Sequence, residues 1–179
     1  MHFPDLALCS YGRGAVSPEA WNVPLLAVGW LEDGFDFSTG EVDGQLISRA
    51  KQIQDETRDR FSMYVYRGLH GCSLCRSGKA SQGIDGSYTN LFIPGNECIY
   101  MVSGGIVHYL DKHSYSPPEE FISALLSCPL PSSTEYEEAL TKVNCGDRPE
   151  LLLTFEELYP DLAKLKSEQD AASNPLPDM

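Results

Sequence analysis

The segment YRGLHGCSLC, residues 66–75, holds one histidine and two cysteines in the order His-x-Cys-x-x-Cys. A second segment, HYLDKH at residues 108–113, holds two more histidines in the order His-x4-His. Thiolate sulfur and imidazole nitrogen are the donors that zinc prefers in proteins, and two such groups at short spacing are typical of a structural zinc site. The sequence therefore predicts a metal site that joins these two parts of the chain.

Five candidate ligands are available for a tetrahedral site that needs four. The first possible set is Cys72, Cys75, His108 and His113. Residues five apart on a straight helix point about 140° away from each other, so both histidines reach one ion only if the helix ends or distorts before His113. The second set replaces His113 by His70, which shares the face of Cys72 on an extended chain. Both sets stay open, and spacing alone does not separate zinc from iron.

Two other interpretations apply to the same residues. Cys72 and Cys75 have the spacing of a thioredoxin-like redox pair, but that chemistry needs a helix just after the first cysteine, and residues 76–79 are poor helix formers. Alternatively, the cluster consists of ordinary thiols and core histidines. The other cysteines are isolated and are interpreted as small buried hydrophobic residues: Cys9, Cys98, Cys128 and Cys145.

The spacing of apolar residues predicts a mixture of strands and helices. Short apolar runs predict strands over residues 25–31, 61–67, 90–93 and 97–102, with a hairpin turn at 94–96. Amphipathic stripes predict a helix over residues 41–58 and another that begins at residue 106 and carries His108 and His113 on it or at its end. Further helices are predicted after Ser116, Ser132 and Thr154. Ser116 and Ser132 each precede a glutamate by three residues, which is the signature of a capping box.

This order of elements indicates an α+β fold, in which a small, mainly antiparallel sheet packs against several helices. The zinc site would join a Cys-x2-Cys turn at a strand end to a later helix. The length predicts a single domain over residues 1–170, whose acidic helical part starts at about residue 117. Residues 171–179 are predicted to form a flexible tail.

Charge is unevenly distributed along the chain, whose net value is −13. Residues 1–116 contain 13 acids and 9 bases, whereas residues 117–179 contain 13 acids and 4 bases. A negative field repels nucleic acid and anionic membranes and attracts a basic protein partner. A weaker interpretation is a zinc-ribbon protein that binds nucleic acid, because basic residues gather near the predicted site. These residues are Arg58, Arg60, Arg67, Arg76 and Lys79.

The N-terminal residues lack the charged start and the apolar run of a signal peptide. No window approaches the roughly 18 apolar residues of a membrane span. These features predict a cytoplasmic protein, and in that compartment the cysteines are expected to be thiols or metal ligands rather than disulfides.

Three patterns resemble those of an uncharacterised bacterial domain family. They are Arg-Gly-x-His-x-Cys-x-x-Cys from residue 67, His-Tyr-x3-His-x-Tyr-x-Pro-Pro-x-x-Phe from residue 108, and Val-Gly-Trp-Leu-x-x-Gly-x-x-Phe-x-Thr-Gly from residue 28. The resemblance covers roughly residues 1–128. It implies that five residues act as a set, without implying an activity: His70, Cys72, Cys75, His108 and His113.

Familiar catalytic motifs are absent from the sequence, including His-Glu-x-x-His, Gly-x-Ser-x-Gly and the phosphate-binding loop. The leading hypothesis is a non-catalytic, zinc-stabilised protein that acts through protein–protein interaction, for example an immunity protein that neutralises a basic toxin. The alternative is a zinc-dependent hydrolase-like enzyme, in which three of the donors bind zinc and Glu97, Asp111 or a spare histidine serves as the base.

Overall fold

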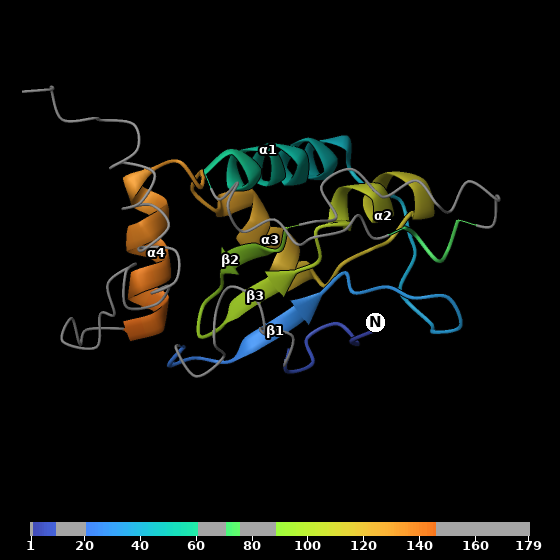
Figure 1. The fold of residues 1–179 in the computed structure, drawn as a ribbon, viewed down its shortest axis with the longest axis horizontal. Helices are drawn as coiled ribbons and strands as arrows, with labels where there is room; N and C mark the ends of the chain where they lie inside the picture. Colours follow the sequence, from blue (N-terminus) through green and yellow to red (C-terminus); the bar gives the residue numbers. More distant parts are fainter. Residues whose placement is uncertain (1, 10–20, 61–70, 76–88, 146–179) are drawn as a thin grey trace, which may run out of the picture.

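The computed structural model describes residues 2–9, 21–60, 71–75 and 89–145 (Figure 1). Within these ranges the chain forms three strands and four helices. They are β1 (Leu25–Val28), α1 (Gly44–Arg60), β2 (Leu91–Pro94), β3 (Ile99–Val102), α2 (Ile106–His113), α3 (Glu119–Ser127) and α4 (Thr134–Cys145). None of these helices combines the length and the apolar character needed to cross a membrane.

The sheet has the strand order β1-β3-β2, so β3 is central. β2 pairs with β3 antiparallel, as the predicted hairpin requires, whereas β1 pairs with β3 parallel. The N-terminal segment extends the sheet antiparallel to β1, because Leu6 N donates to Ala27 O at 2.8 Å and Cys9 N donates to Leu25 O at 2.8 Å. The α+β class is therefore confirmed, with one parallel pairing in an otherwise antiparallel arrangement.

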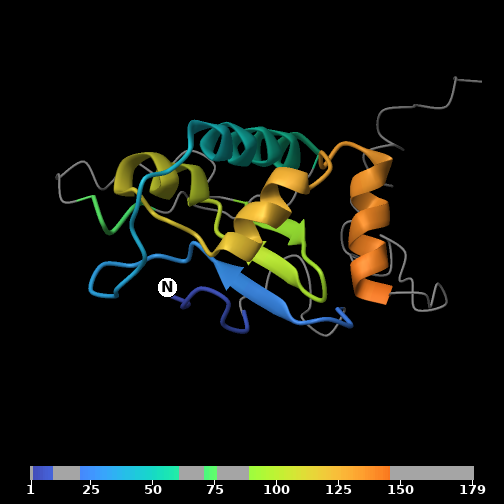
Figure 2. The same cartoon turned by 180° about the vertical axis from the view of Figure 1, so that it is seen from behind.

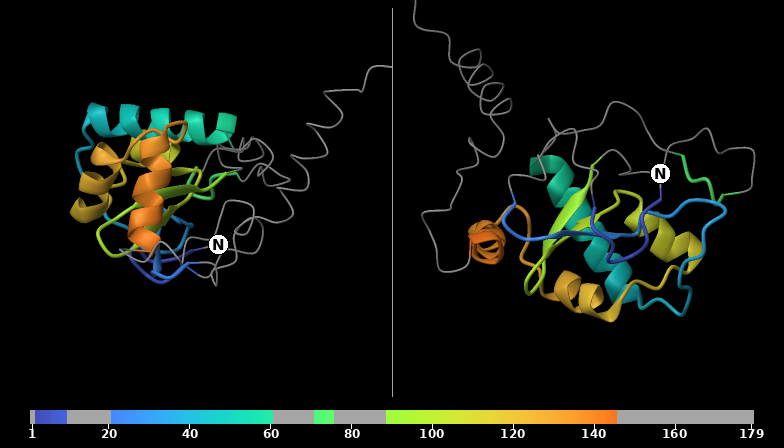
Figure 3. Two further views of the ribbon diagram at one scale, coloured as in Figure 1. Left: turned by 90° about the vertical axis from the view of Figure 1, so that its left-hand side faces the viewer. Right: turned by 90° about the horizontal axis from the view of Figure 1, so that it is seen from below.

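Both faces of the sheet are covered, which explains why all four residues of β3 are buried. Alternate side chains point to opposite faces of a strand. Tyr100 and Val102 join the larger core cluster with residues of α1, α2 and α3, whereas Ile99 and Met101 join a second cluster with Trp30. Figures 2 and 3 show α1 and α3 on one side of the sheet and the N-terminal segment on the other.

Helix α4 closes one end of the sheet (Figure 1). Tyr136 is buried, and its hydroxyl donates to the backbone oxygen of Phe92 in β2 at 2.6 Å. The predicted capping serine is displaced by one residue, because Ser133 Oγ accepts the backbone N–H of Tyr136 at 3.3 Å. Ser132 is not available for this role, since its hydroxyl binds the Glu56 carboxylate in α1.

The capping box predicted at Ser116 is wrong. Helix α3 starts at Glu119, its N-cap residue is Pro118, and no side-chain hydrogen bond caps it. Pro118 has φ −56° and ψ 143°, an extended conformation that delays the start of the helix. The backbone N–H of Ser116 instead donates to Ser38 O at 2.9 Å, so this residue ties α3 to the loop before α1.

Three predicted elements lie outside the described residues. They are the strand over residues 61–67, the helix after Thr154 and the tail over residues 171–179. The domain boundary at residue 170 lies there as well.

The carboxylate of Asp5 connects the N-terminal segment to the chain just after α2. One oxygen accepts both the hydroxyl of Tyr115, at 2.7 Å, and the backbone N–H of Gly29, at 3.1 Å. Tyr115 is fully buried. Gly29 has φ +69°, and a Cβ there would lie 2.8 Å from Ile106 Cδ1, so only glycine fits this contact.

We expect Asp5→Ala to lower the free energy of unfolding by about 2–4 kcal/mol, because it leaves the buried Tyr115 hydroxyl and the Gly29 N–H without their acceptor. Urea unfolding measures this change. Asp36→Ala removes the same charge from an exposed loop and should change stability by less than about 0.5 kcal/mol. Equal effects of the two substitutions would contradict the assignment.

Candidate metal centre

Four of the five candidate ligands come together in space. The ligand atoms of these four residues all lie within 4.8 Å of one another: Cys72, Cys75, His108 and His113. Both thiols come from the segment of residues 71–75, which lies beside the helix α2 that carries both imidazoles (Figure 1). The fifth candidate, His70, lies outside the described residues.

Four of the six distances between these atoms are close to those around one tetrahedral ion. With Zn–S near 2.3 Å and Zn–N near 2.0–2.1 Å, tetrahedral angles place sulfur and nitrogen about 3.5 Å apart and two nitrogens about 3.4 Å apart. The sulfur of Cys72 lies 3.2 Å from His113 Nε2, and that of Cys75 lies 3.4 Å from His108 Nε2 and 3.5 Å from His113 Nε2. The two Nε2 atoms are 3.2 Å apart. The four donor atoms are therefore close enough together to bind one metal ion.

A tight turn positions the two thiols. Cys75 N donates to Cys72 O at 3.3 Å, which closes the Cys-x2-Cys turn. Ser73 Oγ accepts the backbone N–H of Asp33 at 2.9 Å, so the turn is anchored to the loop that follows β1. Cys72 is 4% exposed, whereas Cys75 is only partly buried. One sulfur thus lies in the core and the other toward its margin.

The C-terminal end of α2 explains how two histidines five residues apart reach the same point. Ser114 is left-handed, with φ 50° and ψ 33°, and its backbone N–H donates to Tyr109 O. Tyr115 N donates to the same oxygen at 3.2 Å. A hydrogen bond that spans five residues closes a wider turn than the α-helical one. At this end of the helix the ring centroids of His108 and His113 lie 5.1 Å apart, which removes the geometric objection to the first predicted set.

Burial sets the charge state of the cluster. It lowers the pKa of His108, with further lowering by His113 and Lys112, and it lowers the pKa of His113. Both imidazoles are therefore neutral at pH 7, which is the state that binds a metal. Burial also raises the pKa of the Cys72 thiol, whereas a coordinated cation deprotonates a thiol outright.

Tyr109 forms an apolar side of the cluster. Its ring centroid lies 5.8 Å from that of His108 and 6.2 Å from that of His113. Burial, together with the nearby thiols, raises the pKa of Tyr109 to about 12, so its phenol stays neutral beside the site. The ring covers Gly105, where a Cβ would lie 2.8 Å from the ring atom Cε2. Nothing in the sequence pattern identified Tyr109, Ser114 or the anchoring role of Ser73.

The arrangement suits a structural site better than a catalytic one. A catalytic zinc normally has three protein ligands and one open position, whereas four protein donors converge here. One of the two carboxylates considered as a base, Glu97, lines a separate cavity of about 840 Å³ between the hairpin turn and α4. The other, Asp111, lies on α2 between the two histidines and forms an exposed ion pair with Lys112 at 2.8 Å.

Comparison with known proteins gave a single kind of match. A protein-family profile described as "Domain of unknown function (DUF7919)" matches residues 1–126. The matched range includes all four clustered residues and ends within α3. No curated protein and no solved structure matches the chain significantly.

Proposed function

Because the chain belongs to the uncharacterised domain family DUF7919, for which no activity is known, we propose a function from the cluster and the surface alone. The protein is a non-catalytic domain stabilised by one zinc ion, and it acts by binding a basic protein partner. The observation that carries the first half of this proposal is the convergence of two thiols and two imidazoles at tetrahedral spacing.

In this proposal, zinc is held by Cys72, Cys75, His108 and His113, and it supplies stability rather than chemistry. The metal would join residues 71–75 to α2, in addition to the hydrogen bond that joins Ser73 to Asp33 in the loop after β1. The binding energy of the ion then becomes folding energy.

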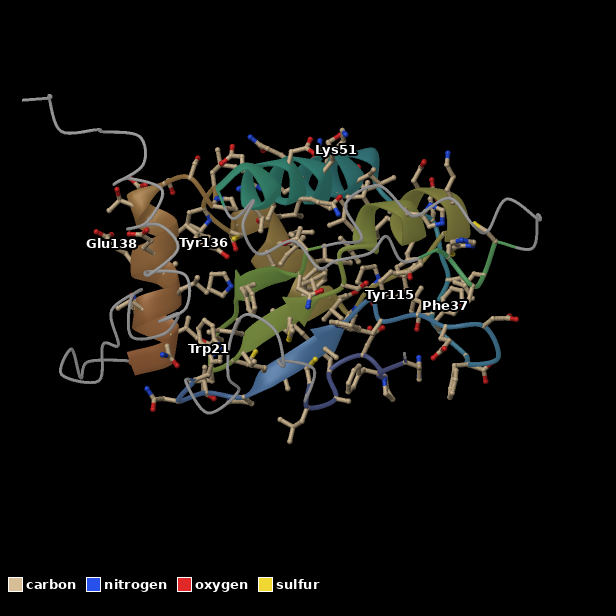
Figure 4. The ribbon with its side chains drawn as sticks, in the orientation of Figure 1. Trp21, Phe37, Lys51, Tyr115, Tyr136 and Glu138 are labelled. Atoms are coloured by element: carbon tan, nitrogen blue, oxygen red, sulfur yellow. The ribbon has the colours of Figure 1, made fainter. Side chains whose placement is uncertain are left out.

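The acidic surface supports the second half of the proposal. Glu135, Glu137 and Glu138 are exposed on α4. Figure 4 shows Glu138 on the side of α4 that faces away from the sheet, while Tyr136 points toward it. With 13 acids and 4 bases over residues 117–179, this part of the chain favours a basic partner by electrostatic complementarity. An immunity protein that neutralises a basic toxin, for instance a nuclease, fits this charge.

The metal centre lies inside the part of the chain that matches the family, whereas the acidic helix α4 lies outside it. The family match ends at residue 126, before α4 begins, so the metal cluster belongs to the shared domain and the α4 surface does not. We therefore assign stability to the shared part and the choice of partner to α4.

Charge reversal on α4 tests the role of this surface. We expect Glu135→Lys combined with Glu138→Lys to abolish growth rescue in cells that express a basic toxin encoded beside this gene. Attraction between oppositely charged surfaces accelerates the association of two proteins by about 10-fold or more at low salt, and the lysines would replace this attraction by repulsion. Co-expression and growth measurement give the result directly.

The matched control reverses two exposed glutamates at the start of α3, Glu119→Lys with Glu120→Lys. This variant has the same net charge, but its lysines lie on α3 rather than on α4, so rescue should persist. The proposal fails if the α4 variant still rescues growth, if both variants lose rescue equally, or if the wild-type protein gives no rescue.

A further inference from the structure

The two thiols of the metal centre differ in their access to solvent. Among the cysteines whose side chains the structure describes, Cys9, Cys72, Cys98 and Cys128 are buried, and Cys75 is partly exposed. Burial raises the pKa of Cys98, and it raises the pKa of Cys128 to about 12, so these two thiols stay protonated and unreactive. Among these five cysteines, Cys75 is therefore the one most accessible to a small oxidant.

The partner for oxidation is already in place. Cys72 and Cys75 are the ends of a four-residue turn, and such a turn keeps its end Cα atoms within about 7 Å, close to the range that a disulfide spans. Their sulfur atoms belong to the group whose members all lie within 4.8 Å of one another. These separations are compatible with a disulfide that forms mainly by rotation of the two side chains.

From this geometry we propose that the Cys72–Cys75 pair is an oxidation site, at which hydrogen peroxide forms a disulfide and releases the zinc ion. The inference rests on the zinc site proposed above. It gives the metal centre a regulatory role, because oxidation consumes two of its four ligands at once. The two remaining imidazoles are too few to hold a structural zinc ion.

The reaction proceeds in two balanced steps. The thiolate of Cys75 attacks one oxygen of the peroxide, the O–O bond breaks, and with one proton the products are a sulfenic acid on Cys75 and water. The thiolate of Cys72 then attacks the sulfenic sulfur, the S–O bond breaks, and the hydroxide that leaves takes up a proton to become a second water. The two sulfurs lose two electrons to the peroxide, and zinc leaves without a change of oxidation state.

Release of the ion would detach residues 71–75 from α2. The bond from Asp33 to Ser73 would remain, but the imidazoles of His108 and His113 would lose their connection to the turn. A thiol reductant reverses the reaction by restoring both thiols, after which zinc can bind again. The oxidised protein should consequently be less stable than the zinc-bound protein.

The test uses the full-length protein purified with its metal. Hydrogen peroxide is added in the presence of 4-(2-pyridylazo)resorcinol, which reports free zinc by colour, and the thiols are mapped by mass spectrometry after alkylation. We expect release of one zinc per chain, a loss of two hydrogens from the intact mass, and a disulfide in the peptide that contains Cys72 and Cys75. Catalase followed by a phosphine reductant and zinc should restore the starting material.

Substitution of two buried thiols outside the metal centre, Cys98→Ala with Cys128→Ala, provides the control, and the rate of zinc release from this variant should match that of the wild type. The inference is overturned if bound zinc stays in place under peroxide, or if the oxidised thiols map to cysteines outside the pair. Protein that contains no zinc at the outset would instead refute the proposed function. The two failures are therefore distinguishable.

Discussion

Removal of zinc with a chelator is expected to lower the melting temperature of the protein by roughly 10 °C or more. A ligand present at about 1,000 times its dissociation constant stabilises the folded state by about 4 kcal/mol, and for a chain of this size each kcal/mol corresponds to about 2–4 °C. Differential scanning fluorimetry before and after chelation gives the value. The expected effect follows from the proposed position of the ion, between residues 71–75 and α2.

The interior of the cluster shows why the loss should be large. Without a cation, the two Nε2 atoms of His108 and His113 lie 3.2 Å apart, and at most one proton can be shared between them. The thiol of Cys72 is buried and is left with only weak hydrogen bonding. Addition of zinc to the stripped protein should restore the original melt, whereas magnesium should not, because magnesium prefers oxygen ligands. An unchanged melt after complete removal of the metal would contradict the structural role.

Replacement of single histidines is expected to separate the two ligand sets. His113→Ala should weaken zinc binding by about 100-fold or more, since changes outside the ligand shell alone cost 10–100-fold. His70→Ala should leave the affinity within a few fold of the wild type, because four donors already converge without that residue. Competition with a chromophoric chelator measures both values. The two substitutions remove the same side chain, so each is the control for the other.

The opposite result would reassign the site. If His70→Ala lost zinc and His113→Ala kept it, the fourth ligand would be His70, and the 3.2 Å approach of His113 to Cys72 would be an ordinary hydrogen bond. If both substitutions weakened zinc binding equally, His70 and His113 would exchange with each other as ligands of the same ion. Cys72→Ser gives a further reference, because it removes a sulfur ligand of every proposed set.

Much of the fold could be predicted from local patterns. The stripe of Leu46, Ala50 and Ile53 predicted the buried face of α1, and all three side chains are buried. The turn at residues 94–96 predicted the hairpin, which pairs β2 and β3 antiparallel. These features depend on residues close in sequence, whose spacing carries the period of a helix or a strand.

Features that depend on contacts between distant residues could not be predicted in this way. Leu25 pairs with Ile99, and nothing in either strand specifies that β1 lies parallel to β3. The capping box at Ser116 failed because its backbone is engaged with Ser38 in another loop. In each case, a partner far away in the sequence competes with the local preference.

The candidate site shows the same division. The spacing of Cys72 and Cys75 predicted the thiol pair, since a turn of that length aims both sulfurs at one ion. The choice between His70 and His113 could not be made, because it depends on how α2 ends, in a turn wider than the α-helical one that is followed by the left-handed Ser114. Such a conformation is uncommon for residues other than glycine, asparagine and aspartate, so a serine gives little warning of it.

X-ray absorption at the zinc edge of the purified protein tests the central claim most directly, since it reports both the identity of the metal and its ligands. The proposed structural site predicts one zinc per chain, bound by two sulfurs at about 2.3 Å and two nitrogens at about 2.0 Å. A zinc ion with an oxygen ligand from water would contradict the structural role and favour an enzyme. Protein without metal would show that the cluster consists of buried thiols and hydrogen-bonded histidines.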